Sequence, residues 1–71
     1  MLKSKLLAFV ESYNKDYNHD FEVNFEDDGM NIITTSIFSQ VFVTLFMELH
    51  SENPFCFYIT ETRGYPTIYC Y

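Results

Sequence analysis

Strict alternation of polar and apolar residues runs through one stretch of the chain, Asp20-Phe21-Glu22-Val23-Asn24-Phe25-Glu26. Successive side chains of a β-strand point to opposite faces of a sheet. The stretch therefore predicts a half-buried strand, with three apolar side chains on one face and three carboxylates with Asn24 on the other.

The turn after this strand is predicted at Asp28-Gly29, a strong signal for a type I′ hairpin. The next segment, 30–35, is rich in β-branched residues and is expected to return as the second strand. A two-residue loop at this turn pairs Phe25 with Ile32 on the inner face.

A second hairpin is expected at the end of the chain. Its strands are predicted at 55–60 and 67–71, joined by a turn at Arg63-Gly64. This loop pairs Cys56 with Tyr71, so the second cysteine, at position 70, lies on the opposite face. The register argues against a disulfide or a shared thiol site.

Two further segments carry helical spacing. Apolar residues recur every three or four positions over 2–17, which predicts an amphipathic helix. The other segment, 37–51, fits the alternation of a strand as well as a helical stripe. The flanking residues favour the helix, because Thr35 or Ser36 can cap its start and Asn53-Pro54 can end it.

The order helix, hairpin, helix, hairpin predicts a single α+β domain over 1–71 with αββαββ order. We expect a four-stranded antiparallel sheet with two helices on one face. The order also reads as an αββ pseudo-repeat, residues 1–35 and 36–71. If 41–49 is extended instead, one helix lies on a five-strand antiparallel meander. In either fold the core is expected to include Phe9, Phe25, Ile32, Phe57 and Ile59.

The composition of the chain and its lack of catalytic motifs limit the functions that can be expected. The 71 residues carry ten Asp or Glu against four Lys or Arg, for a formal net charge of −6. Nucleic-acid binding takes most of its affinity from basic side chains that neutralise phosphates, so direct binding to DNA or RNA is not expected. The Gly-rich phosphate loop and the GxSxG, HExxH and CxxC motifs do not occur in the sequence. We expect no enzymatic activity and no cofactor.

The two histidines and the acidic turn are expected to have structural roles. His19 and His50 have no spaced Cys ligand beside them, and turn or helix-end positions are expected for both. The acidic turn 24–29 resembles the start of an EF-hand loop, but Thr35 stands where that loop needs a bidentate Glu. No metal site is therefore expected.

The start of the chain and its cysteines predict a cytoplasmic protein. The first apolar run is interrupted by Glu11 after five residues, shorter than the apolar core of a signal peptide. No stretch approaches the roughly 18 apolar residues of a membrane span, and no membrane contact is expected. The two cysteines lack CxxC spacing and are expected to be reduced thiols.

Two surface features remain as candidate partner-binding sites. The first is an acidic run, expected as a regular row along the first strand and its turn: Asp20, Glu22, Glu26, Asp27 and Asp28. A solvated strand face that discourages edge aggregation explains the run equally simply. The second feature is the outer side of the C-terminal hairpin, with Tyr58, Tyr69 and Tyr71. If both helices cover the other face, these rings have nothing intramolecular to cover them.

The leading hypothesis is a non-enzymatic, acidic binding protein. Its carboxylates imitate a phosphate backbone, and it acts as a stoichiometric inhibitor that occludes a basic, nucleic-acid-handling surface of a larger protein. Small size, strong acidity and an aromatic-rich surface resemble the general style of phage-encoded anti-CRISPR or anti-restriction proteins, a likeness of composition that assigns no residues. The alternative is a homo-oligomeric structural or adaptor subunit, such as a homodimer, that self-associates through the Tyr-rich sheet face.

Overall fold

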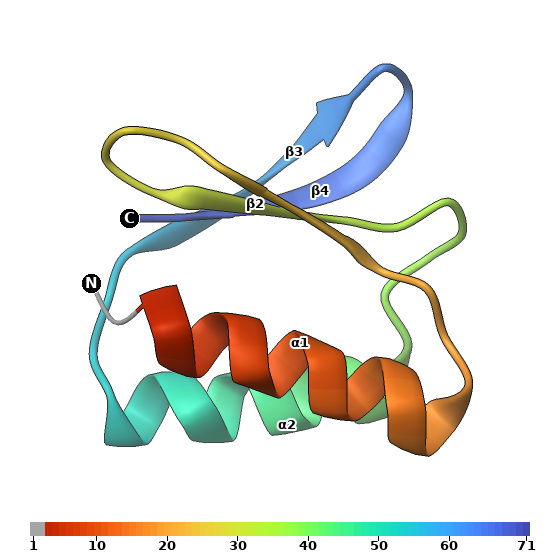
Figure 1. The fold of residues 1–71 in the computed structure, drawn as a ribbon, viewed down its shortest axis with the longest axis horizontal. Coiled ribbons are helices and arrows are strands. Elements are labelled where there is room, and N and C mark those ends of the chain that lie inside the picture. Colours follow the sequence, from red (N-terminus) through yellow and green to blue (C-terminus); the bar gives the residue numbers. More distant parts are fainter. Residues whose placement is uncertain (1–2) are drawn as a thin grey trace.

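Two helices and a four-stranded antiparallel sheet make up the fold (Figure 1). The computed structural model describes residues 3–71. In chain order the elements are α1 Lys3–Tyr17, β1 Glu22–Phe25, β2 Met30–Ile33, α2 Gln40–Glu52, β3 Phe57–Thr62 and β4 Tyr65–Cys70. The strands lie in the order β1-β2-β4-β3, so β1 and β3 are the edges, and both helices lie on the same side of the sheet. The predicted αββαββ fold is confirmed.

Helix α1 buries one stripe of its surface against the sheet. Leu6, Val10 and Tyr13 follow one another at steps of four and three residues, and all three are buried. The helix ends where Asn18 takes a positive φ of 55°, a conformation that Asn tolerates better than most residues. The predicted helix is confirmed over the described residues, and its expected first residue, Leu2, lies outside them.

Most of the ambiguous segment 37–51 forms helix α2, so the alternative fold with a five-strand meander is wrong. Phe42 and Phe46, four residues apart, are buried, while Val41, Val43 and Met47 are exposed on the outer surface of the helix. Within residues 3–71, neither helix is long and apolar enough to cross a membrane.

The start of α2 differs from the prediction. The cap is Ser39, whose hydroxyl accepts the N–H of the residue three positions later at 3.1 Å, and not Thr35 or Ser36. Thr34, directly after β2, is still held to the sheet, because its N–H donates to the carbonyl of Pro66 at 3.0 Å. The chain uses the following residues to cross from the sheet to the helical layer, which delays the helix (Figure 1).

The C-terminal hairpin has the predicted register. Arg63 and Gly64 both have positive φ, 52° and 86°, as the two central residues of a type I′ turn require. Cys56 and Tyr71 exchange two backbone hydrogen bonds of 2.9 and 2.8 Å. The two cysteines are free, one exposed and one buried, as expected for opposite faces.

The N-terminal hairpin is shifted by two residues from the prediction. Phe25 lies opposite Met30, and not opposite Ile32. The turn spans 26–29 and is closed by the N–H of its first residue, which donates to the carbonyl of its last at 2.8 Å. A shift of two residues leaves every side chain on its expected face, so the pattern of inner and outer residues survives the error.

Glycine is required at position 29 because another strand lies close to it, and not because the turn needs a positive φ. Gly64 has a positive φ, whereas Gly29 does not. A Cβ at Gly29 would overlap the carbonyl oxygen of Cys70 and lie 2.7 Å from the hydroxyl oxygen of Tyr69. The missing side chain lets the N-terminal turn pack directly on β4.

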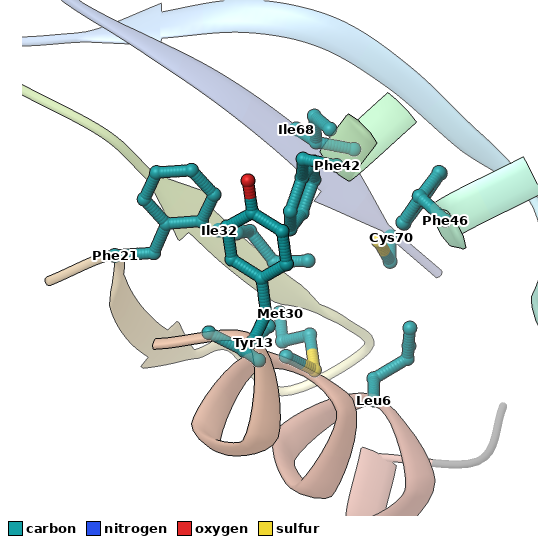
Figure 2. Close-up of a cluster of buried hydrophobic side chains, with 10 residues drawn as sticks. Leu6, Tyr13, Phe21, Met30, Ile32, Phe42, Phe46, Ile68 and Cys70 are labelled. Atoms are coloured by element: carbon teal, nitrogen blue, oxygen red, sulfur yellow. The ribbon is translucent and has the colours of Figure 1, made fainter. Parts of the chain in front are cut away.

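The core lies between the helices and the sheet (Figure 2). Its buried members come from both helices, from the link before β1 and from β2 and β4: Leu6, Val10, Tyr13, Phe21, Met30, Ile32, Phe42, Phe46, Ile68 and Cys70. Phe42 is the centre, with ring centroids of Tyr13 and Phe21 at 5.0 and 4.8 Å in edge-on contact. Burial of Ile32 is confirmed, and Phe9 and Phe57 are partly buried against this cluster.

Two predicted core residues are wrong. Phe25 is 52% exposed and Ile59 is 65% exposed, although both side chains belong to the inner face of the sheet. Phe25 ends its strand, and the ammonium of Lys3 lies 5.9 Å from its ring centroid. Ile59 lies on the edge strand β3, whose hairpin with β4 bends away from the helical layer (Figure 1). Alternation predicts the face of a side chain, but not whether a helix covers that part of the face.

Candidate binding surface on the open face of the sheet

No helix lies over the face of the sheet that points away from α1 and α2, which we call the open face (Figure 1). One row of paired residues crosses all four strands on this face: Asn24, Asn31, Tyr69 and Tyr58. The neighbouring row consists of Glu22, Ile33, Thr67 and Thr60. Ile33 and Thr67 in this second row are buried, so the accessible part of the face is polar and acidic toward β1 and, in the first row, aromatic toward β3.

Three tyrosines form a single patch on this face. The ring centroids of Tyr58 and Tyr69 are 5.4 Å apart, those of Tyr69 and Tyr71 are 5.7 Å apart, and those of Tyr58 and Tyr71 are 6.0 Å apart. All three distances lie in the range of favourable aromatic pairs. Tyr58 and Tyr71 remain about half exposed, at 51% and 47%. We call this preformed patch the tyrosine triad.

The tyrosine triad is joined to the acidic turn. The Tyr69 hydroxyl donates to Oδ1 of Asp28 at 2.5 Å, between residues 41 positions apart in the chain. This bond, together with desolvation and the negative charge of the carboxylate, raises the pKa of Tyr69 from 10.0 to about 12. The hydroxyl therefore stays protonated at neutral pH and keeps the Asp28 carboxylate beside the rings.

A second carboxylate is held by the neighbouring strand. Nδ2 of Asn31 donates to Oε1 of Glu26 at 3.1 Å, and Asn31 is the residue paired with Tyr69. Glu26 and Asp28 thus approach the central row from the same turn. We use the name acidic–aromatic surface for Glu22, Glu26 and Asp28 together with the tyrosine triad.

The predicted acidic residues are distributed unevenly around this surface. Glu22 is exposed on the open face of β1, and Asp27 is exposed in the turn. Asp20 is also exposed but lies before β1, outside the sheet. The carboxylates do not form the expected regular row, because β1 has only four residues and the other acidic groups belong to the connections at its two ends.

Sequence reasoning missed two residues that shape the surface. Asn31 is part of a predicted strand but was given no functional role. Its polar side chain among apolar neighbours is the signal that it faces outward. Gly29 was interpreted as a turn residue, and no local signal distinguishes that use from a close approach to β4.

Cys70 and His50 contribute to the structure of the domain. Cys70 is fully buried, and desolvation raises the pKa of its thiol to about 12, which makes it an unreactive apolar side chain. Nε2 of His50 lies 2.8 Å from the carbonyl oxygen of Phe55, beside the end of α2. In the part of the chain from Lys3 to Tyr71, no three His, Cys, Asp or Glu side chains gather as a metal site, and no pocket is present.

Comparisons with protein-family models, with curated proteins and with solved structures find no match for this chain. The interpretation of the acidic–aromatic surface rests on its own geometry and charge.

Proposed function

We propose that this protein is a non-enzymatic binding protein that attaches its acidic–aromatic surface to a basic surface of a larger protein. The observation that carries the proposal is the hydrogen bond from Tyr69 to Asp28, because it joins the tyrosine triad to the acidic turn. Protein interfaces combine an aromatic, partly apolar centre with a polar rim. Tyrosine supplies large contact area together with a hydrogen-bonding tip, and it is enriched among the residues that dominate binding energy.

Charge selects the class of partner. The protein has a formal net charge of −6, and Glu22, Glu26 and Asp28 all belong to the open half of the molecule. Complementary charge accelerates association and disfavours partners of the same sign. The partner is therefore expected to present Lys and Arg side chains around a surface that accepts the tyrosine rings.

A groove that handles nucleic acid is the basic surface that we propose as the target. The carboxylates stand in for phosphates, and the tyrosines take the place of stacked bases, so binding occludes the groove stoichiometrically. This mode of action resembles in style that of phage-encoded anti-CRISPR or anti-restriction proteins. We place it in the cytoplasm, where the free thiols of Cys56 and Cys70 remain reduced.

Self-association through the same face is less well supported. Two copies placed face to face bring the carboxylates of both acidic–aromatic surfaces into one interface. Glu22, Glu26 and Asp28 have no cation among the strand residues of their own face. Like charges brought close together in this way oppose association.

Two charge-matched variants test the proposal. Reversal of Glu22, Glu26 and Asp28 to Lys changes the acidic–aromatic surface, whereas reversal of Glu11, Asp16 and Glu48 to Lys changes exposed helix positions by the same net charge. The immobilised wild type and the helix variant are expected to retain the same protein from host extract, and the surface variant is expected to lose it. Equal retention by the two variants would contradict the proposal.

Competition then tests the inhibitory mechanism. Nucleic acid and this protein are expected to displace one another from the captured partner, and the on-rate of the wild type is expected to fall steeply with added salt. A partner that binds both at once without loss of affinity rules out phosphate mimicry, even where the carboxylates contribute to binding.

A further inference from the structure

The outer edge of β3 carries unpaired backbone groups. Cys56 exchanges both of its backbone hydrogen bonds with Tyr71 of the C-terminal segment, and antiparallel pairs alternate between bonded and non-bonded positions. The backbone groups of residues 58, 60 and 62 therefore point toward β4. Those of Phe57, Ile59 and Glu61 point away from the sheet, and within residues 3–71 they have no hydrogen-bond partner.

The two edges of the sheet differ in protection. The β1 edge has four residues, and the segment just before it is held by the side chain of Asn14, which bonds both the N–H and the carbonyl of Phe21 at 2.9 and 3.0 Å. The β3 edge has six residues, Phe-Tyr-Ile-Thr-Glu-Thr, without Lys, Pro or a bulge. Natural proteins use such devices to prevent edge pairing, and β3 carries only one of them, the charge of Glu61 on the inner face. With six residues against four, β3 is the longer edge and remains open to another strand.

Ile59 is a large apolar side chain that the helices of its own chain leave uncovered. It lies opposite the buried Ile68 on the inner face, yet 65% of its surface is exposed. A further strand alongside β3 places an inner-face side chain directly beside Ile59.

We propose that β3 pairs antiparallel with β3 of a second copy of this chain, with Ile59 opposite Ile59 of that copy. This register alone uses all three outward-facing residues of each strand. Ile59 pairs with its equivalent, and Phe57 pairs with Glu61 in both directions. Each of these pairs exchanges two backbone hydrogen bonds, which makes the edge self-complementary. The result is a continuous antiparallel sheet across a two-fold axis.

The self-complementary hydrogen bonding of the edge favours a second copy as the occupant, and the register also separates the charges of the two strands. Glu61 is the only charged residue of β3. In this register Glu61 lies beside Phe57 of the second copy, whose ring centroid is 5.2 Å from the imidazole of His50 in the same chain. Each Glu61 is thus paired with an aromatic residue, and the two carboxylates lie at opposite ends of the paired segment. The acidic groups of Glu22, Glu26 and Asp28 belong to the opposite half of the sheet and stay outside the contact.

Substitutions of opposite charge at position 59 test whether the β3 edge forms the dimer and whether Ile59 lies opposite its equivalent. Ile59→Lys and Ile59→Glu each place like charges directly opposite one another in a dimer, which opposes pairing. Sedimentation velocity is expected to show a dimer for the wild type, monomers for each variant alone, and a restored dimer for their equimolar mixture. Because Ile59 is exposed, both variants are expected to keep the wild-type far-ultraviolet circular dichroism spectrum.

Ile37 provides the matched control. It is 75% exposed in the link between β2 and α2 and belongs to no strand, so Ile37→Lys and Ile37→Glu are expected to leave the dimer unchanged. A wild type that stays monomeric at high micromolar concentration overturns the proposal. So does a mixture of the two Ile59 variants that remains monomeric. Either result leaves partner binding by the acidic–aromatic surface to be judged by its own variants.

Discussion

The two hairpins of this protein place a glycine at their turns for different physical reasons. Gly64 has a positive φ of 86° and open space where a Cβ would stand. Gly29 has no positive φ, but a Cβ there would collide with the backbone of Cys70 in β4. The C-terminal turn is thus determined by local backbone preference, whereas the N-terminal turn is determined by packing between the hairpins. That packing also brings Asp28 to Tyr69.

The largest effect is expected at Gly29. Gly29→Ala forces the N-terminal turn away from β4, because the new Cβ meets a backbone carbonyl that has no rotamer to change. We expect a loss of about 3 kcal/mol in the free energy of unfolding, at the upper end of overpacking effects. Urea denaturation measures the loss. A value close to that of the wild type would show that the two hairpins are not in tight contact.

A smaller effect is expected at Gly64. Gly64→Ala meets no neighbour, so its cost is that of a left-handed conformation, about 1 kcal/mol. Gly64→Asn is expected to cost less, because Asn tolerates positive φ. The same denaturation experiment distinguishes the hairpins: Asn is expected to rescue position 64 relative to Ala, and to be worse than Ala at position 29. Equal ranking of the two residues at both positions contradicts the proposed difference.

The smallest effect is a change in pH dependence. The pKa of Tyr69 is raised from 10.0 to about 12, so its contribution to stability is complete below pH 10 and is lost as the pH rises toward 12. The buried thiol of Cys70, with its pKa also raised to about 12, adds a similar loss above pH 9. Tyr69→Phe keeps only the cysteine contribution. We expect its unfolding free energy to fall less than that of the wild type between pH 10 and 12. Parallel curves for the two proteins would contradict the assignment.

The same difference between the hairpins explains how far the fold was predictable. The C-terminal register follows from Arg63-Gly64 alone, and the prediction is confirmed. The N-terminal register depends on contacts with β4, and the two-residue loop at Asp28-Gly29 was wrong. The end of helix α2 was predictable from Asn53-Pro54, but its cap was not, because the length of the crossing from Thr34 depends on the distance between layers.

The candidate surface was predictable in its parts and not in its connection. Alternation placed Tyr58 and Tyr69 on the outer face, and composition marked the acidic turn. That Asp28 meets Tyr69 follows from β2 lying between β1 and β4, a strand order that short-range patterns do not encode. The exposure of Ile59 has the same origin, because coverage by helices is a tertiary property.

Titration of the Tyr69 hydroxyl tests most directly whether the two hairpins form one surface. Nuclear magnetic resonance of protein labelled at tyrosine Cζ resolves the individual tyrosines across the alkaline range, in the wild type and in Asp28→Asn. We expect a pKa of about 12 for Tyr69 in the wild type and a return toward 10.0 in the variant, because the anionic acceptor is removed. A wild-type Tyr69 that titrates near 10.0, or one that Asp28→Asn leaves unchanged, would show that the acidic turn and the tyrosine triad are not joined.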